Sequence, residues 1–324
     1  MAAMRPGRTD GGAAHPLRHT RPVTTSPLIS VDELAARLLG VDRDPILRVC
    51  DVRWYLGRPG DGRAAYAAGH LPDAVFVDLD EDLADPPGPG RHPLPDPARF
   101  VARLAELGVG RDSPVVAYDD VGGGIAARLW WMLDALGHEA VHVLDGGMQA
   151  WVDAGLPLAI DEPTPAPAEP IAVRPWGRVI DADALAERLG GLTLVDVRAP
   201  ERYRGESEPV DPKAGHIPTA VNAPIGGNLG PDGRFLPPDE LTARYRALGP
   251  TDREVVLYCG SGANACHGAL AMRIAGLPDP TVYAGSFSDW SRADREVVTG
   301  PAPGVPGPSS APGGPGATRG APPR

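Results

Sequence analysis

Residues 255–275, V-V-L-Y-C-G-S-G-A-N-A-C-H-G-A-L-A-M-R-I-A, contain the signals that decide the fold. The four apolar residues at the start indicate a short buried strand, and the alanine-rich end indicates a helix over residues 265–275. Between them stands Cys259, and Gly260 and Gly262 allow a tight turn there. In parallel α/β sheets, ligands bind at the carboxyl ends of strands. We therefore expect an α/β fold with a reactive thiol at a strand end.

The surroundings of Cys259 favour chemistry at its sulfur. A thiolate, and not a thiol, is the nucleophile, and backbone N–H groups at a helix N-terminus stabilise negative charge there. The other two cysteines, Cys50 and Cys266, are predicted to be small core residues. Three cysteines in a chain of 324 residues make no disulfide framework, so we expect a reducing, cytoplasmic compartment.

Composition and charge argue against several classes of partner. The chain has 31 Lys and Arg against 42 Asp and Glu, a formal net charge of −11, which disfavours nucleic acid and anionic membrane surfaces. No apolar run approaches the roughly 20 residues that span a bilayer. The sequence has no Cys-x-x-Cys pair and no clustered His and Cys spacing. We therefore expect neither a metal nor another cofactor.

Segments rich in Pro and Gly divide the chain. Residues 1–26 are predicted to be a disordered arm, although their Arg-containing, acid-poor composition also fits a transit peptide. The Pro-rich residues 161–176 are predicted to be a semi-rigid linker between two domains, residues 27–160 and residues 177–299. Residues 300–324 are mostly Pro, Gly, Ala and Ser and are predicted to be a disordered tail.

The two halves of the chain repeat each other. Three segments recur in the same order: residues 51–53 (DVR) at 196–198, residues 68–72 (AGHLP) at 214–218 (AGHIP), and residues 144–151 at 283–290. Such recurrence indicates two copies of one fold. In the second copy, apolar runs predict strands at 192–197, 255–258 and 281–283, and helices at 239–248, 265–275 and 287–292. This alternation predicts a mainly parallel sheet covered on both faces.

These repeated segments, together with the closing Y-A-G-S-F-S-D-W of residues 283–290, resemble the rhodanese superfamily of sulfurtransferases over residues 28–298. The loop C-G-S-G, residues 259–262, resembles the 3-mercaptopyruvate sulfurtransferase branch, because the thiosulfate branch carries Arg and Lys after the cysteine. The resemblance implies two tandem rhodanese-like domains. Each would be a mainly parallel central sheet flanked by helices.

The resemblance also implies that only the second domain is catalytic, and the residues agree. When the strand before Cys259 is aligned with residues 115–118, Asp119 falls at the position of the cysteine. A carboxylate cannot carry a transferable sulfur. The Asp-Val-Arg and Gly-His segments occur in both halves, so we assign Arg198 and His216 a structural role.

The activity that the resemblance implies is transfer of a sulfane sulfur from 3-mercaptopyruvate, through a persulfide on Cys259, to a small thiol, thioredoxin or cyanide. In the family, a Ser-His-Asp relay handles the proton of the substrate thiol. Ser261, His92 and Asp80 match its members. A neutral imidazole accepts a proton and a carboxylate orients it. The alternative for His92 is a solvated side chain in a Pro- and Gly-rich loop.

The donor's carboxylate calls for arginine, because a planar guanidinium binds it in two-pronged fashion. Arg202 matches one of the family's two substrate arginines. The second belongs between Gly205 and Gly215, where this chain has no Arg and where Lys213 is the available cation. The remaining predicted donor-binding residues belong to the loop and the helix after it: Gly260, Gly262, Ala263 and Asn264. The last two stand where the family has Val-Thr.

Three other functions are alternatives to this interpretation of the sequence. A cysteine-dependent phosphatase needs Cys-x5-Arg, and residue 265 is Ala, which excludes the oxyanion clamp. Thiosulfate:cyanide sulfurtransferase activity remains the alternative within the family. A persulfide carrier that serves a protein partner is the non-enzyme alternative. Steady-state pyruvate formation favours the enzyme, whereas persulfide loading with slow release favours the carrier.

Overall fold

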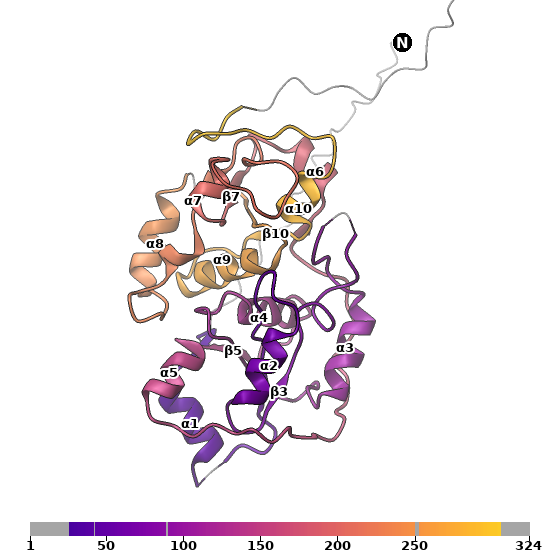
Figure 1. Ribbon diagram of the computed structural model, residues 1–324, viewed down its shortest axis with the longest axis vertical. Helices are drawn as coiled ribbons and strands as arrows, with labels where there is room; N and C mark the ends of the chain where they lie inside the picture. The colour runs from indigo at the N-terminus through magenta and orange to yellow at the C-terminus, as the bar shows by residue number, and fades with distance from the viewer. Residues whose placement is uncertain (1–25, 42, 89, 250–252, 306–324) are drawn as a thin grey trace, which may run out of the picture.

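The computed structural model describes residues 26–41, 43–88, 90–249 and 253–305. Figure 1 shows two lobes stacked along the long axis, the first half of the chain below and the second half above. The predicted arm and most of the predicted tail lie outside these residues. Within the described residues, no helix combines the length and apolar character needed to cross a membrane.

The first domain alternates strands and helices in the predicted way. Its short strands are mostly apolar, and all four residues of β4 are buried. The elements are β1 Leu28–Ile29, α1 Val31–Leu39, β2 Arg48–Asp51, α2 Asp61–Ala68, β3 Ala74–Phe76, α3 Pro97–Glu106, β4 Val115–Tyr118, α4 Ala126–Ala135, β5 Val141–Leu144 and α5 Gly147–Asp153.

The second domain repeats this sequence of elements with one added 3-10 helix, η1. They are β6 Val179–Ile180, α6 Ala182–Glu187, β7 Thr193–Asp196, α7 Pro200–Tyr203, β8 Val221–Asn222, η1 Ile225–Asn228, α8 Pro238–Arg246, β9 Val255–Tyr258, α9 Ala263–Ile274, β10 Thr281–Tyr283 and α10 Ser286–Trp290. The strands predicted at 255–258 and 281–283 have those bounds. Helix α9 begins two residues earlier than predicted, so Ala263 and Asn264 belong to its first turn.

The two sheets have the same topology. Each has five parallel strands, in the order β1-β5-β4-β2-β3 in the first domain and β6-β10-β9-β7-β8 in the second. Strands β4 and β9 occupy equivalent central positions. Their carboxyl ends therefore lead into equivalent loops, and the duplication inferred from the sequence holds for the fold.

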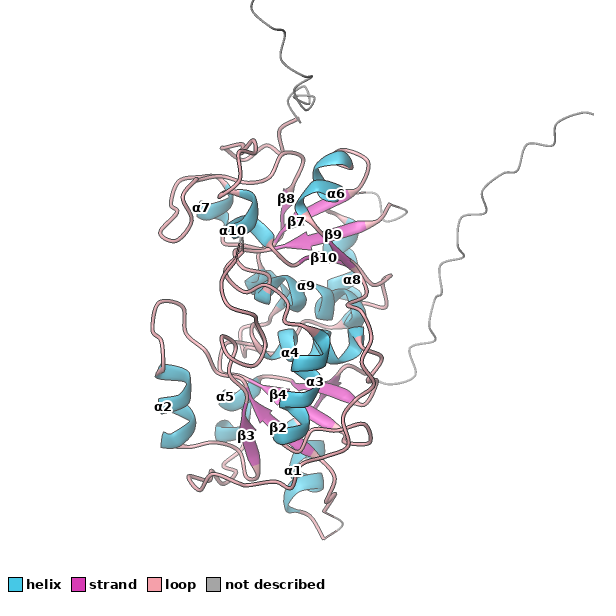
Figure 2. Cartoon of the chain, turned by 90° about the vertical axis from the view of Figure 1, so that its right-hand side faces the viewer, coloured by secondary structure: helices cyan, strands magenta, loops and turns pink. Residues whose placement is uncertain are grey.

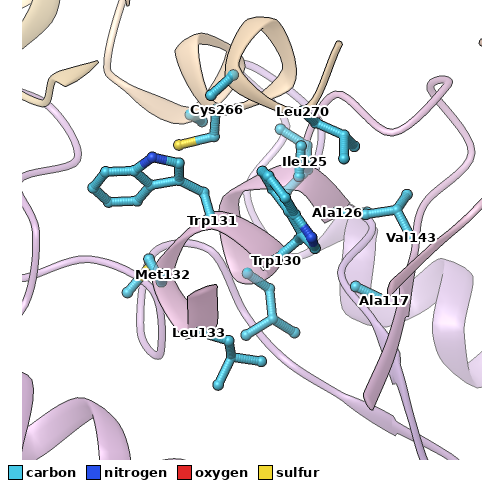
Figure 3. Packing of buried hydrophobic residues seen from close by; sticks show 14 of the residues in the cluster. Ala117, Ile125, Ala126, Trp130, Trp131, Met132, Leu133, Val143, Cys266 and Leu270 are labelled. Carbon is cyan, nitrogen blue, oxygen red and sulfur yellow. The ribbon is translucent and has the colours of Figure 1, made fainter. Parts of the chain in front are cut away.

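A central hydrophobic cluster joins the two domains. Helices α4 and α9 pack against each other between the two sheets (Figure 2). Trp130 and Trp131 of α4 share this cluster with Cys266 and Leu270 of α9 (Figure 3). Cys50 is also wholly buried, and burial raises the pKa of the Cys50 and Cys266 thiols to about 12. The domain interface is thus part of the core, and it places residues of the first domain next to the loop after β9.

The outer face of each sheet has its own helices. In the first domain, α1 and α5 contribute buried residues to a second cluster. In the second domain, α6, α7 and α10 do the same for a third cluster. Both sheets are therefore covered on both faces, as the alternating pattern predicts.

The repeated Asp-Val-Arg segments form the same buried network in both domains. Arg53 pairs with Asp51 at 2.6 Å, and Arg198 pairs with Asp196 at 2.7 Å. Each arginine also donates to the carbonyl of the glycine in its Gly-His segment, at 2.8 and 2.6 Å. A buried ion pair that is fully hydrogen-bonded avoids the cost of an isolated charge. The network ties the end of the second strand of each sheet to the segment that enters the next strand.

The linker and the beginning of the tail are bound to the domains. Ala168 donates its N–H to the Ala105 carbonyl at 2.9 Å, so the Pro-rich linker runs along α3. Residues 300–303, which we expected in the disordered tail, are hydrogen-bonded to the second domain. The N–H of Gly300 donates to the Arg204 carbonyl at 2.9 Å. The predicted start of the tail is therefore too early.

Candidate active site

The second-domain loop, residues 259–262, joins β9 to α9. Cys259 is only 3% exposed, and the N–H of Gly262 donates to its Sγ at 3.0 Å. Gly262 has φ 93°, and a Cβ there would lie 2.4 Å from the Ala284 carbonyl oxygen. Only glycine allows this turn. The loop thereby directs a backbone N–H at the start of α9 to the sulfur, where it stabilises negative charge.

The segment after β10 holds this loop from behind. Ser286 Oγ accepts the N–H of Cys259 at 3.1 Å and donates to the Tyr283 carbonyl at 2.9 Å. The N–H groups of Phe287 and Ser288 donate to the loop carbonyls of residues 259 and 260, at 3.0 and 2.9 Å. Ser286 has φ 54°, a strained conformation for a residue with a side chain. Three of these hydrogen bonds fix the backbone around Cys259, and the fourth anchors Ser286 to the end of β10.

The structure brings the three predicted relay residues together across the domain boundary. Ser261 Oγ lies 2.8 Å from His92 Nδ1, and His92 Nε2 lies 3.0 Å from Asp80 Oδ1. Trp54 Nε1 donates to the other Asp80 oxygen at 2.8 Å, and its ring meets the imidazole edge to face. His92 is buried, which contradicts the alternative of a solvated side chain.

The hydrogen bonds determine the direction in which the relay moves a proton. The hydrogen bond with His92 lowers the pKa of Asp80 below its usual range, so the carboxylate is ionised and only accepts. His92 Nε2 must therefore carry a hydrogen. In the neutral imidazole, Nδ1 is then the acceptor for the Ser261 hydroxyl. The arrangement suits removal of a proton at Ser261, two residues from the nucleophile.

Two guanidinium groups approach the loop at Gly260. A Cβ on Gly260 would lie 2.7 Å from Arg91 Nη2 and 3.4 Å from Arg202 Nη1. Arg202 forms ion pairs with Glu208 at 2.6 Å and with Asp211 at 3.2 Å. Asp211 also pairs with Arg91. One arginine belongs to each domain, so the cationic side of the loop, like the relay, is built from both halves.

Two predicted donor-binding residues make other contacts. Lys213 Nζ donates to the carbonyls of Ala293 and Arg295, both at 2.9 Å. The structure therefore uses this ammonium to hold a backbone segment, and the second cation at Gly260 comes from the first domain. Asn264 faces the first domain, because a Cβ on Gly124 would lie 3.5 Å from its Oδ1. Ala263 is buried in the central cluster.

A buried arginine links the relay to the loop. Arg128 of α4 is wholly buried, and its Nη2 donates to the His92 carbonyl at 3.1 Å and to the Leu83 carbonyl at 3.2 Å. Its Nη1 lies 3.4 Å from the position that a Cβ on Gly262 would occupy. This side chain therefore fixes the backbone that carries the imidazole and places a positive charge behind the loop. No group of three or more potential metal ligands occurs among the described residues.

The family model for the rhodanese-like domain matches this chain twice, over residues 30–154 and 181–293. The chain belongs to the rhodanese family. Each matched region covers one parallel sheet and its helices, except for the short first strand, β1 or β6, which ends just before it. The candidate site described above lies where the two rhodanese domains meet.

Relatives and a solved structure resemble this rhodanese over most of its length. A Pseudomonas aeruginosa protein named "Probable 3-mercaptopyruvate sulfurtransferase" is 46% identical over 288 residues, 86% of this chain and 100% of that protein. The thiosulfate sulfurtransferase of Rattus norvegicus is 35% identical over 273 residues, 82% of this chain and 92% of that protein. The crystal structure of the 3-mercaptopyruvate sulfotransferase SseA from Escherichia coli superposes with a TM-score of 0.71 at 30% identity, covering 81% of this chain and 99% of that one. This rhodanese is accordingly a sulfurtransferase.

Sequence reasoning missed several residues of this site in the rhodanese. Arg91 stands directly before His92, and that adjacency was the available signal. Arg128 is the lone charge in the apolar run of α4 before Asp134, a pattern that indicates a buried, hydrogen-bonded cation. Ser286 gave no signal, because its strained backbone is visible only in the structure.

Proposed function

We propose that this rhodanese moves sulfur from 3-mercaptopyruvate to an acceptor through a persulfide on Cys259. The first domain, residues 27–160, supplies the relay, and the second, residues 177–299, supplies the nucleophile. The acceptor is a small thiol, thioredoxin or cyanide. The free, buried cysteines support a reducing, cytoplasmic setting, in which the thiolate stays available.

The first half-reaction balances without a cofactor. The Cys259 thiolate attacks the sulfur of the donor, an S–S bond forms, and the C–S bond of the donor breaks. The electron pair of that bond remains on carbon as the enolate of pyruvate. The proton of the donor thiol passes through Ser261 and His92 to that carbon. The products are pyruvate and an anionic persulfide on the cysteine.

The second half-reaction regenerates the enzyme. A thiolate of the acceptor attacks the outer sulfur of the persulfide, and the S–S bond to Cys259 breaks. The electron pair returns to the cysteine sulfur, where the N–H of Gly262 stabilises it. With cyanide as the acceptor, the carbon attacks the same sulfur and thiocyanate leaves.

We base the preference for 3-mercaptopyruvate on the chain of hydrogen bonds from Ser261 through His92 to Asp80. A thiol donor has a proton that must leave its sulfur, and a relay at 2.8 and 3.0 Å can accept it. Thiosulfate is fully ionised and has no such proton. A relay placed two residues from the nucleophile therefore serves a thiol donor.

Thiosulfate is the second candidate donor, and one observation favours it. Its sulfonate oxygens would suit the cationic side of the loop at Gly260 as well as a carboxylate does. The similarity to a thiosulfate sulfurtransferase is compatible with this candidate. The persulfide carrier differs from both enzymes in kinetics, because it would load once and release sulfur slowly.

The test compares kcat/KM for 3-mercaptopyruvate and thiosulfate in the wild type and in Ser261→Ala, with Ser207→Ala as the exposed matched control. We expect Ser261→Ala to lower kcat/KM for 3-mercaptopyruvate by about 10²–10⁴-fold, the usual value of acid–base catalysis. With thiosulfate the change should be small. Equal losses with both donors, or no loss with 3-mercaptopyruvate, would remove the relay from the mechanism. Wild-type enzyme that forms one equivalent of pyruvate and then stops would favour the carrier.

A further inference from the structure

We propose that Arg91 of the first domain and Arg202 of the second form one two-pronged oxyanion site over Gly260, and that Asp211 is the positioning residue that holds the two guanidinium groups in register. The site takes the negatively charged end of the sulfur donor. It rests on the proposed function only in assuming that the donor reacts at Cys259.

The guanidinium groups of the two arginines converge on one point, at Gly260. Arg91 Nη2 and Arg202 Nη1 lie 2.7 and 3.4 Å from the position of a Cβ on Gly260. Gly260 follows the nucleophile directly in the chain. An oxyanion bound by both nitrogens would therefore lie beside the reacting sulfur, and the absent side chain of Gly260 leaves the space that the guanidinium groups use.

The two terminal nitrogens of each guanidinium group make different contacts. Asp211 pairs through Oδ1 with Arg91 Nη1 and through Oδ2 with Arg202 Nη2, the latter at 3.2 Å. Among the described residues, no hydrogen bond is made by Arg91 Nη2 or Arg202 Nη1. Each planar fork thus uses one terminal nitrogen to bind the bridging carboxylate and directs the other toward Gly260.

The charges of the groups around Asp211 also favour a bound anion. Arg292 also approaches Asp211, with Nη1 3.9 Å from Oδ1, and Glu208 pairs with Arg202. Glu208 also pairs with Arg198, which pairs with Asp196. Four arginines therefore face three carboxylates, 4 − 3 = +1, and the carboxylates leave one positive charge uncompensated. Burial lowers the pKa of Arg91, and only neighbouring negative charges oppose that effect. A single bound anion would complete the charge balance of this partly buried cluster.

The fixed position of Arg91 shows that the arrangement spans both domains. Its backbone N–H donates to Ser288 Oγ at 3.0 Å, and Ser288 donates its own N–H to the loop carbonyl of Gly260. Just before it, a Cβ on Gly90 would lie 2.9 Å from the Gly285 carbonyl oxygen. The segment that carries Arg91 is therefore packed directly on the segment that holds the nucleophile.

The test uses two alkylating agents that differ in charge, iodoacetate and iodoacetamide, on the full chain with Cys50→Ser and Cys266→Ser. The ratio of their rates at Cys259 measures anion recognition without requiring sulfur transfer. We expect Arg91→Gln and Arg202→Gln each to lower the iodoacetate-to-iodoacetamide ratio by about tenfold, the value of one hydrogen bond to a charged group. Arg204→Gln, at an arginine that pairs with Glu206, is the matched control and should leave the ratio unchanged.

Three further variants separate positioning from folding. Asp211→Asn should lower the ratio by a smaller factor and raise KM for 3-mercaptopyruvate more than it lowers kcat. The double variant Arg91→Gln, Arg202→Gln should lose less than the product of the two single losses, because the residues bind one anion. Arg91→Lys should restore part of the ratio, since it keeps the charge and loses the fork.

The outcomes distinguish this site from the proposed function. A ratio unchanged in Arg91→Gln overturns the oxyanion site whatever the enzyme's activity. A ratio that falls, in a wild type that transfers no sulfur from 3-mercaptopyruvate or thiosulfate, refutes the proposed function and leaves the site standing. KM values for the two donors then identify the anion: a rise in Arg91→Gln for 3-mercaptopyruvate alone indicates a carboxylate, and a rise for thiosulfate alone indicates a sulfonate.

Discussion

The first-domain loop, residues 119–125, follows β4 just as the second-domain loop, residues 259–262, follows β9. Asp119 stands at the position of Cys259 and is wholly buried. Its two oxygens accept four backbone N–H hydrogen bonds of 2.8–2.9 Å, from Val121, Gly123, Ile125 and Ala126. The turn after the central strand therefore directs backbone N–H groups at the residue that opens it in both domains: four at the Asp119 carboxylate, and that of Gly262 at the Cys259 sulfur.

The difference between the loops lies in side chains and in what faces them. Gly122 and Gly262 occupy equivalent positions and share a positive φ, 70° and 93°. Val121 stands at the position of Ser261 and offers no hydroxyl to a relay. The second-domain loop also receives Arg91 from the other domain. Duplication thus gave the fold two equivalent turns, and we propose that side chains from both halves make one of them reactive.

Moving the thiol between the loops tests this comparison with the largest expected effect. Cys259→Ser should lower sulfur transfer by about 10⁴-fold or more, the usual loss of a catalytic nucleophile. Adding Asp119→Cys should restore none of it, because no hydroxyl stands at Val121 to begin a relay. The measurements are pyruvate release and the mass of the persulfide-loaded protein.

The controls for this exchange keep the native nucleophile. Asp119→Cys with Cys259 intact should remain active, which shows that the altered first domain still folds. Cys50→Ser and Cys266→Ser should each retain most of the activity. Sulfur transfer by the Asp119→Cys, Cys259→Ser protein would contradict the view that the loop needs its interdomain partners.

The first-domain loop should contribute more to stability than the second-domain loop. Asp119→Asn replaces one oxygen by an NH₂ group, so two backbone N–H donors lose their acceptor. Each unsatisfied donor costs about 1–3 kcal/mol, and we expect the free energy of unfolding to fall by about 2–6 kcal/mol in urea denaturation. Cys259→Ser should cost much less, because within the described part of the chain its sulfur accepts one hydrogen bond, from Gly262. Asp112→Asn, at an exposed position, is the control. If Asp119→Asn lost no more stability than this control, the four N–H hydrogen bonds to Asp119 would not contribute to stability as we expect.

The fold was predictable from the sequence because its signals are local and repeated. Apolar runs such as residues 255–258 indicate buried parallel strands wherever they stand. The recurring Asp-Val-Arg segments gave the duplication, and Asp119 identified the half without a nucleophile. The relay was predictable only through resemblance, since nothing in the residues around His92 shows that it meets a loop 169 positions away.

The cationic side of the site was not predictable in the same way. Arg91 lies in an irregular segment, where no periodicity determines the direction of a side chain. Its position at Gly260 depends on how the two domains pack. Lys213 was assigned by its place in the sequence, but its ammonium binds carbonyls about 80 residues further on. Contacts between segments of opposite domains are therefore the part that the structure adds.

The last difference between the loops is the residue behind them, and its expected effect is the smallest. Gly147 and Ser286 are equivalent and both have φ 54°. A Cβ on Gly147 would lie 2.2 Å from the Asp119 carbonyl oxygen, whereas the Ser286 hydroxyl binds the N–H of Cys259.

Ser286→Gly would make the second loop like the first. It relieves strain of order 1–3 kcal/mol and loses two hydrogen bonds of about 0.5–1.5 kcal/mol each, so the free energy of unfolding should change by no more than about 2 kcal/mol. Ser286→Ala keeps the strain and loses the same hydrogen bonds, so it should be the less stable variant. Urea denaturation of both variants measures the order. If the Ala variant were the more stable one, the positive φ at this position would not strain a residue that has a side chain, which would contradict the strain inferred for Ser286.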